Sequence, residues 1–311
     1  MVRFVRLSPF ALVFLLMRSL AAEADMCAID MGSNSVRRIV GSFANGRYAQ
    51  RSMEVHTLSV GDDVTRYGRI TDAMLAEIER TLTAFKNACD KDGAAPIVAV
   101  GTAAYRQASN GRRVAEIAGK VGISMEIATE RRESELAYLV GSLGQDGVAV
   151  IDNGSRSIEL TSKDSALRYR VVDLGYRVAY ERFFANARDA SAAVEAFRRE
   201  LQRVASAAPF MKGKKTLVGI ELGEMAAAVL EIADIEGHAI ALGVLKQKLD
   251  EIRLMTPEAF EAFKKKKDID RALPRLVVAS TLAEAFGYSE IVLTVRELGT
   301  GLIIEAAMKQ H

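Results

Sequence analysis

Two short stretches of small and acidic residues carry the side chains that phosphate chemistry needs. Residues 30–35 read DMGSNS, and residues 152–159 read DNGSRSIE. In each stretch an apolar run delivers an aspartate to a turn of small residues, after which the chain resumes as a strand. Gly32 can take a positive φ, and small side chains leave backbone N–H groups open to an anion. We expect the two turns to face each other across a cleft and to hold a phosphoryl group with its cation.

The first half of the chain predicts three antiparallel strands, followed by alternating helices and strands. Asn45 and Gly46 form a turn of the type that joins hairpin strands. Thr71 or Asp72 can cap a helix that runs to about Ala88. The expected order is strands at 26–30, 36–43 and 46–56, a polar loop at 58–63, that helix, a strand at 96–101, a helix at 111–120, a strand at 124–128 and a helix at 131–140.

The opening pattern recurs in the second half, after three glycines in residues 141–147 that mark a hinge. We expect strands at 147–152, 156–162 and 167–173, a long helical region from Gly175 with a break near Asn186, a strand at 216–220, helices near Leu222, at 240–253 and at 269–286, a strand at 290–295 and a C-terminal helix. Each half therefore begins with a three-strand meander and continues as α/β. The predicted domains are residues 26–145 and 146–311.

The composition limits the classes of protein that fit. With 311 residues, half of them apolar and 26% charged, the chain can bury the cores of two domains. A formal charge of +2 provides no field that would attract nucleic acid. Three dispersed histidines argue against histidine-based metal or triad chemistry. The two cysteines, Cys27 and Cys89, are too few for a disulfide framework or a metal cluster, and Cys27 is expected to be a small core residue.

Residues 1–25 have the pattern of a secretory signal. A basic start, an almost wholly apolar run over 10–17 and small residues at Ala22 and Ala24 match its three regions. The apolar run is too short for an ordinary transmembrane helix, so no stable membrane span is expected. The predicted location is therefore periplasmic or secreted. Two alternatives stay open: an uncleaved tether, and a cytoplasmic protein whose true start is Met26.

Four segments, in a fixed order, resemble the exopolyphosphatase and guanosine pentaphosphate phosphatase family. They are residues 30–35, 101–110 (GTAAYRQASN), 131–139 (RRESELAYL) and 150–160, and the likeness covers essentially all of 26–311. The resemblance implies an α/β fold of two ribonuclease-H-like domains with an interdomain cleft, as in actin, sugar kinases and the Hsp70 ATPase. It also implies Mg²⁺ or another divalent cation, and hydrolysis that releases terminal phosphate from inorganic polyphosphate or a guanosine pentaphosphate-type phosphoanhydride.

The same resemblance implies roles for individual residues. Glu133 falls on the family's catalytic glutamate, and Arg106 on the arginine that faces the phosphate chain. The implied metal ligands are Asp30, Asp152 and Glu159. The implied phosphate-binding residues are Gly32, Ser33, Asn34, Ser35, Gly154, Ser155, Arg156 and Ser157. A sparse carboxylate set suits Mg²⁺, which keeps water and phosphate oxygens as ligands, and an oriented water can suffice to hydrolyse a phosphoanhydride.

The second turn departs from the family pattern, because Ser155 and Arg156 stand where the family has glycines. They would be strained, or would block phosphate, if those positions need a positive φ or a close approach. Arg156 could instead bind phosphate through its side chain. Residues 221–224 read ELGE and add acid, and residues 298–301 read LGTG, without the family's arginine and glutamate.

Three hypotheses follow from these observations. The first is an enzyme that acts on polyphosphate or a phosphorylated small molecule. The second is a catalytically degenerate member that binds polyphosphate or a phosphorylated nucleotide without turnover. The third is a structural or partner-binding role. A homodimer is a possible assembly.

Overall fold

Each half of the described chain opens with the three-strand meander that the sequence predicts. The computed structural model describes residues 25–309, so residues 1–24 of the signal-like segment lie outside the described part. In the first half the antiparallel strands are β1 (Met26–Met31), β2 (Ser35–Ala44) and β3 (Arg47–Thr57). In the second half they are β6 (Val148–Asn153), β7 (Ile158–Lys163) and β8 (Leu167–Val172). The two predicted meanders are confirmed.

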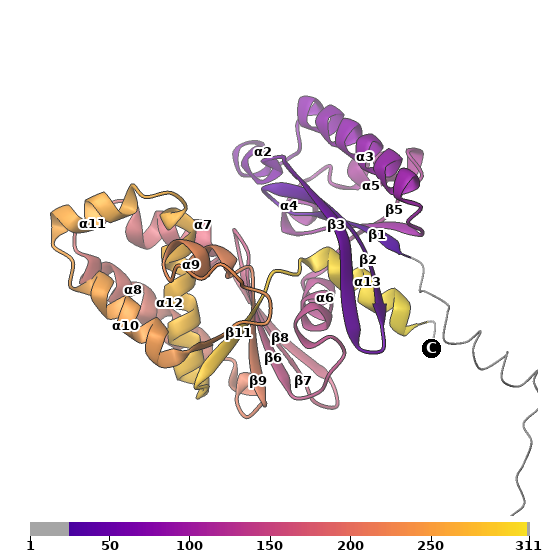
Figure 1. Ribbon diagram of the computed structural model, residues 1–311. Coiled ribbons are helices and arrows are strands. Elements are labelled where there is room, and N and C mark those ends of the chain that lie inside the picture. The colour runs from indigo at the N-terminus through magenta and orange to yellow at the C-terminus, as the bar shows by residue number, and fades with distance from the viewer. Residues whose placement is uncertain (1–24, 310–311) are drawn as a thin grey trace, which may run out of the picture.

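The first lobe is built on a five-stranded sheet of order β3-β2-β1-β4-β5, at the upper right in Figure 1. Strands β4 (Ile97–Gly101) and β5 (Ser124–Ile127) extend it in parallel to β1. Buried residues on one face of the sheet, among them Ile29 and Val36, pack against a layer of helices. These helices are α2 (Val60–Tyr67), α3 (Asp72–Asp92), α4 (Ala103–Gln107) and α5 (Arg112–Lys120).

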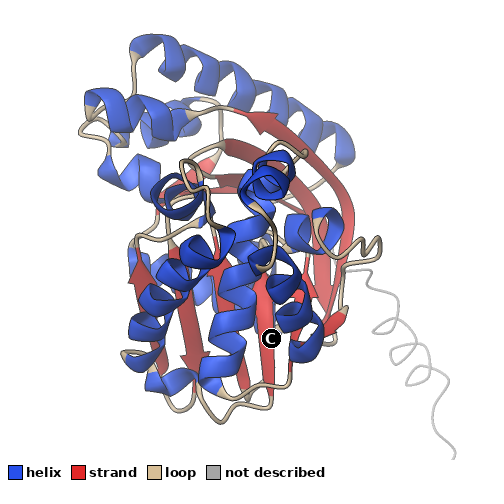
Figure 2. Cartoon of the chain, turned by 90° about the vertical axis from the view of Figure 1, so that its left-hand side faces the viewer, coloured by secondary structure: helices blue, strands red, loops and turns tan. Residues whose placement is uncertain are grey.

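The second lobe is built on a six-stranded sheet of order β10-β11-β9-β6-β7-β8. Its later strands are β9 (Thr216–Ile220), β10 (Ala239–Ala241) and β11 (Glu290–Thr294). A large apolar core joins one face of this sheet to the helices that Figure 2 shows in front of the strands. These are α7 (Tyr176–Ala179), the π-helical turn η1 (Tyr180–Phe184), α8 (Ala190–Ser206), α9 (Gly223–Ala228), α10 (Leu242–Arg253), α11 (Pro257–Lys264) and α12 (Ile269–Phe286), with a 3₁₀ turn η2 (Pro209–Met211) after α8.

Two helices occupy the junction of the lobes, α6 (Glu130–Ser142) and α13 (Leu298–Met308). On one side of α6, Leu136 packs with Ile303 of α13 and with the first sheet. On its other side, Val140 packs against Val150 of the second sheet. Figure 1 shows α13, in yellow, returning from the second lobe to lie beside α6 and β2. Helix α6 therefore lies between the sheets, where it can present side chains to both lobes.

Three elements differ from the sequence expectation. Helix α2 replaces the polar loop expected at 58–63, because Val60 and Val64 turn into the core of the first lobe. The short strand β10 precedes the helix expected at 240–253, which begins at Leu242. Helix α11 was not expected, although its start is conventional: the Thr256 side chain accepts a hydrogen bond from the N–H of Ala259. Within residues 25–309, none of the helices combines the length and apolar character needed to cross a bilayer.

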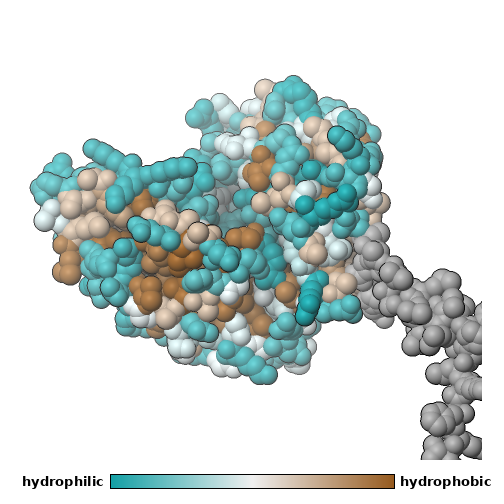
Figure 3. Space-filling model, in the orientation of Figure 1, coloured by the Kyte–Doolittle hydropathy of each residue, from teal (hydrophilic) through white to brown (hydrophobic). Residues whose placement is uncertain are grey.

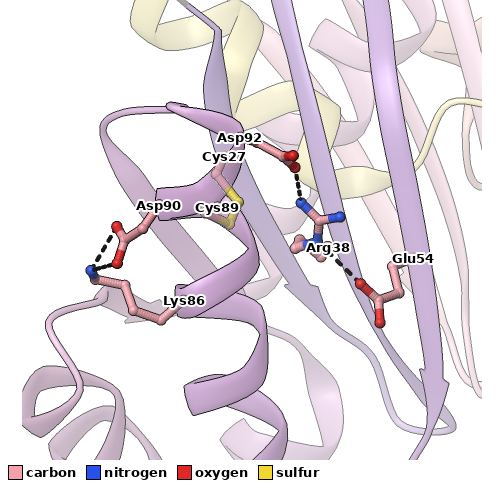
Figure 4. The surroundings of a disulfide bond; sticks show 7 residues. All are labelled: Cys27, Arg38, Glu54, Lys86, Cys89, Asp90 and Asp92. Carbon is pink, nitrogen blue, oxygen red and sulfur yellow. Dashed lines mark hydrogen bonds and ion pairs between the residues drawn. A yellow bond between two sulfur atoms is a disulfide. The ribbon is translucent and has the colours of Figure 1, made fainter.

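The cysteines are a further correction, because Cys27 and Cys89 form a disulfide. Both are fully buried, and their Cα atoms lie 6.0 Å apart, within the usual range for disulfides. The bond joins β1 to the last turn of α3 across 62 residues of chain (Figure 4). Close to it, the Arg38 guanidinium donates to Asp92 at 2.6 Å and so also links β2 to the end of α3. Cys27 is a core residue, as expected, but its disulfide with Cys89 was not predicted.

Candidate functional site

The cleft between the lobes holds a cavity of about 220 Å³, lined by both sheets and by α6. The surface is hollowed between the lobes and is mainly hydrophilic there (Figure 3). Most of the predicted site residues line the cavity: Asp30, Gly32, Ser33, Asn34, Ser35, Glu133, Asp152, Gly154, Ser155, Arg156, Ser157 and Glu159. Arg106 is the exception. The structure thus brings residues together that are more than 120 positions apart in the chain.

The first hairpin, β1 and β2, places Asp30 opposite Arg37. The buried Asp30 carboxylate accepts hydrogen bonds from the backbone N–H groups of Leu298 and Gly299 at the start of α13. Burial raises the pKa of Asp30 to about 6, while the charge of Arg37 acts in the opposite direction. A Cβ on Gly299 would lie 3.3 Å from the Asp30 Cβ, so the glycine allows α13 to approach β1 closely.

The turn of the first hairpin is held by backbone contacts. The N–H of Gly32 donates to the carbonyl of Ser35 at 2.9 Å, and the N–H of Gly61 donates to the carbonyl of Ser33 at 2.7 Å. The backbone of Gly32 is not left-handed, contrary to the reason expected for a glycine there. Instead, a Cβ on Gly32 would lie 3.2 Å from the Ser35 carbonyl oxygen. The turn needs a small residue because it is tightly closed.

The second hairpin, β6 and β7, places Asp152 opposite Glu159. Glu159 is buried and Asp152 is half-buried; desolvation raises the pKa of Glu159 to about 8 and that of Asp152 well above its ordinary range. The charge of Glu221 raises both pKa values further, whereas the Ser157 hydroxyl, which donates to Glu159 at 2.5 Å, and the charge of Arg106 lower the pKa of Glu159. Two facing carboxylates in a buried place favour a bound cation.

The turn of the second hairpin is braced by the start of α7. The N–H of Gly175 donates to the carbonyl of Arg156, and the N–H of Tyr176 donates to that of Gly154. A Cβ on Gly175 would lie about 2.4 Å from the Gly154 oxygen, so only glycine fits. Neither Ser155 nor Arg156 has a left-handed backbone, so the loss of the family's glycines causes no strain of that kind.

The Arg156 side chain crosses the cleft instead of filling it. Its guanidinium donates to the Thr65 hydroxyl of α2 at 2.7 Å, although the residue still lines the cavity. A second arginine, Arg177, pairs with Asp62 of α2 at 2.9 Å. Together these contacts join the second turn to the first lobe and leave the cavity open.

Glu133 projects from the first turn of α6 into the cavity, and Arg106 of α4 holds it there. The Arg106 guanidinium donates to the Glu133 carboxylate at 2.5 Å and to the Ala128 carbonyl at 2.6 Å. The N–H of Ala103 also donates to the carboxylate. Burial raises the pKa of Glu133 despite these contacts. Arg106 therefore lies behind Glu133 and does not line the cavity wall.

The further cavity residues that the sequence did not indicate include Arg37, Tyr176, Arg271 and Arg275. Arg37 could have been found as the cross-strand partner of Asp30. It pairs with Glu297 at 3.3 Å, which lies just before α13 and whose pKa burial raises to about 8. Arg275 could have been found as a buried charge directly before the apolar run 276–279 of α12; it pairs with Glu224 at 2.8 Å.

The donor set fits a magnesium ion. Six carboxylates and four guanidinium groups line the cavity, so a polyanion would meet net negative charge without a cation. In the part of the chain that the structure describes, no three Asp, Glu, His or Cys side chains surround one point. Mg²⁺ suits such a site, because it is bound through one or two carboxylates, with water and phosphate oxygens completing its shell.

The sequence profile described as the Ppx/GppA phosphatase family matches residues 39–310. The chain belongs to the Ppx/GppA phosphatase family. No protein with a curated description matches the sequence. A Ppx/GppA family member from Aquifex aeolicus has a similar structure, with a TM-score of 0.79 and 23% identity over 93% of this chain and 99% of that one.

Two further solved structures resemble this Ppx/GppA member. An exopolyphosphatase from Cytophaga hutchinsonii has a TM-score of 0.69 and 17% identity, over 92% of this chain and 98% of that one. A nucleoside triphosphate hydrolase from Neospora caninum is more distant, with a TM-score of 0.55 and 10% identity over 97% and 96% of the two chains. The expected fold class, two α/β domains with the architecture of actin, sugar kinases and the Hsp70 ATPase and a cleft between them, is confirmed.

Proposed function

We propose that this protein is a magnesium-dependent phosphohydrolase that releases the terminal phosphate of inorganic polyphosphate. The observation that carries the proposal is the single cavity that collects both small-residue turns, Glu133, and the facing pair Asp152 and Glu159. Membership of a phosphatase family supports the reaction type. The turns offer backbone N–H groups and small side chains to the phosphate, as expected for a site that stabilises spreading negative charge.

In this proposal Glu133 orients the attacking water. The carboxylate is held from behind by Arg106 and by the N–H of Ala103, so its position is fixed before substrate binds. Its raised pKa suits a group that accepts a proton. Water attacks the terminal phosphorus, the bond to the bridging oxygen breaks, and the water proton passes to Glu133. Arg106 has the role of a positioning residue rather than that of a phosphate ligand.

Asp152 and Glu159 would hold the magnesium ion. When bound, the ion would supply positive charge that neutralises the negative charge developing on the phosphate. Asp30 was also predicted as a metal ligand, but it already accepts two N–H groups and faces Arg37. We therefore expect Asp30 to contribute less to metal affinity than the pair in the second hairpin.

The disulfide supports an oxidising compartment outside the cytoplasm. Stable disulfides are rare in reducing cytosol and common in exported proteins. The Cys27–Cys89 bond is buried, and the N-terminal sequence pattern points independently to export. Polyphosphate is then a more accessible substrate than guanosine pentaphosphate. A cytoplasmic protein that begins at Met26 would instead keep both cysteines as thiols, which alkylation of freshly isolated protein would detect.

The test is release of orthophosphate from polyphosphate by purified protein in the presence of Mg²⁺. Glu133→Gln should reduce the rate by about 10²–10⁴-fold, the usual contribution of a positioned proton acceptor. Glu135→Gln is the matched control, since it lies on the same helix, pairs with Arg131 and does not line the cavity. Equal rates for wild type and Glu133→Gln would contradict the proposal.

A second candidate is binding without turnover, and the altered second turn favours it. Ser155 and Arg156 replace glycines of the family pattern, and Arg156 is engaged with Thr65. Calorimetric binding of polyphosphate by a protein that releases no orthophosphate with any divalent ion would select this candidate.

A further inference from the structure

The backbone of Glu221 has an unusual conformation, and its acidic side chain lies at the cavity. It follows β9 directly and has a φ of 56°, in the left-handed region that non-glycine residues seldom adopt. The residue lines the cavity, and its side chain is 23% exposed. A disfavoured conformation at a cavity wall indicates that the surrounding structure fixes this side chain there.

The Glu221 carboxylate lies between arginines of the two lobes. Its Oε1 is 3.8 Å from Nη2 of Arg37 on β2, and its Oε2 is 3.6 Å from Nη2 of Arg275 on α12. The same Oε2 lies 3.8 Å from the position that a Cβ on Gly154 would take, so it also faces the turn of the second hairpin. An anionic group thus already stands against a small-residue turn, between two guanidinium groups.

We propose that Glu221 is a built-in anion that occupies a phosphate-binding position next to the terminal-phosphate position, and that it determines how many phosphates the cavity accepts. Two guanidinium groups around one tetrahedral oxyanion form an arrangement well suited to phosphate. Glu221 holds this arrangement with a carboxylate. A substrate whose second phosphate enters the position must displace that carboxylate. The proposal deepens the proposed function and rests on it for the identity of the substrate.

The two arginines have other partners that keep them in place. Arg37 pairs with Glu297 at 3.3 Å. Arg275 pairs with Glu224 at 2.8 Å, and its guanidinium lies 4.1 Å from the centre of the Tyr176 ring. The contacts of Glu221 are longer than these, so its carboxylate is the one most easily displaced. Removing it should leave the arginines oriented and expose their charge to an incoming phosphate.

The experiment compares Glu221→Gly and Glu221→Gln with wild type. The probe is methylenediphosphonate with Mg²⁺, titrated calorimetrically, because its two phosphonates cannot be hydrolysed apart. Both variants should bind it about tenfold more tightly or better, which corresponds to the removal of one like charge from a partly buried anion position. Glu221→Gln keeps the side-chain size, so agreement of the two variants separates charge from space.

Glu231→Gly is the matched control. Glu231 is another glutamate with a left-handed backbone conformation, with a φ of 59°, but its side chain is exposed and does not line the cavity. The Glu231→Gly substitution should leave the affinity for methylenediphosphonate unchanged. Circular dichroism of each variant establishes that it is folded; if Glu221→Gly is not, Glu221→Gln decides. Affinity in the folded Glu221 variants that equals wild type or falls below it, or binding by none of the proteins, would overturn the inference.

Orthophosphate release from polyphosphate by the same proteins separates this inference from the proposed function. Tighter binding by the Glu221 variants with no release by any protein would retain the inference and remove the hydrolase. If wild type releases orthophosphate but the Glu221 variants gain no affinity, the hydrolase is retained and the inference about Glu221 is overturned.

Discussion

The two lobes present the same hairpin to the cleft with opposite charge arrangements. In the first hairpin an acid faces a base, because Asp30 lies opposite Arg37. In the second an acid faces an acid, because Asp152 lies opposite Glu159. Each turn is braced through a glycine at the start of the helix that follows the three-strand meander, Gly61 in one lobe and Gly175 in the other. The two hairpins therefore share their backbone geometry and differ in the charge of the residue opposite the aspartate.

The charge difference leads us to expect a cation at the second hairpin rather than at the first. In the first hairpin Arg37 lies opposite Asp30, and its charge and two N–H groups of α13 lower the pKa of that carboxyl. In the second hairpin the two carboxylates lie opposite each other, and Arg106, whose charge acts on Glu159, is already paired with Glu133. We therefore expect a cation to bind at the second hairpin, while both turns contact phosphate.

The largest difference should be seen when each aspartate is neutralised. Asp152→Asn should lower Mg²⁺-dependent orthophosphate release on the order of 10²–10³-fold, since it removes a group that stabilises charge in the reaction. Asp30→Asn should cost less, because its charge is already balanced. Rates measured over a range of Mg²⁺ concentrations test this ordering. Equal losses, or a greater loss in Asp30→Asn, would remove the distinction between the hairpins.

The disulfide distinguishes the lobes in stability, since both cysteines of the chain lie in the first lobe. Replacing both Cys27 and Cys89 by alanine should lower the free energy of unfolding by about 2–4 kcal/mol, because a long loop in the unfolded chain is released. Chemical unfolding in guanidinium chloride measures it. Wild type unfolded with reductant should lose a similar amount. If reductant leaves its stability unchanged, the loss in the variant comes from packing alone.

Replacing the glycines that brace the two turns should lower stability by different amounts. Gly175→Ala places a Cβ about 2.4 Å from backbone and should destabilise by about 1–3 kcal/mol. Gly61→Ala meets Ser33 at 3.1 Å and should cost less. Gly119→Ala in α5 meets nothing within 4 Å and should be neutral or stabilising, which makes it the control. Urea unfolding curves rank the three, and a tolerant Gly175 would show that the second turn is not tightly braced.

The smallest effect concerns pH and Glu297. Its pKa is raised by burial from 4.5 to about 8, so the folded state retains a proton that the unfolded state releases between these values. Metal-free protein should therefore lose stability as pH rises through this window. In Glu297→Gln the fall of Tm across this pH window should be smaller by a few degrees. It should not vanish, because Glu159 still titrates in the same window. Identical slopes in the two proteins would contradict the assigned pKa.

Most of the fold could be predicted from the sequence, because strand and helix periods are local. The meanders, the helix over 269–286 and the strand at 216–220 were placed within a residue or two. Helix α2 was missed because it is short and polar, and its burial depends on contact with the first turn. The disulfide was missed because two cysteines 62 residues apart carry no local signal of proximity.

The candidate site likewise has parts that could be predicted from the sequence and parts that could not. The two turns could be found because each is one continuous stretch. The bridging role of Glu221 and the pairing of Arg37 with Glu297 could not, since these contacts join β9, β2, α12 and the start of α13. The placement of Arg106 behind Glu133 likewise depends on how α4 packs beside α6. Charge compensation in a cleft is a tertiary property and has no sequence period.

The most direct test of the central claim, that one cavity holds phosphate and metal together, is ³¹P relaxation of tripolyphosphate bound to the protein with Mn²⁺ in place of Mg²⁺. A paramagnetic ion held by Asp152 and Glu159 should strongly accelerate relaxation of the bound phosphates, and Asp152→Asn should abolish the acceleration. Bound tripolyphosphate whose relaxation Mn²⁺ does not change, or changes equally in Asp152→Asn, would contradict the account.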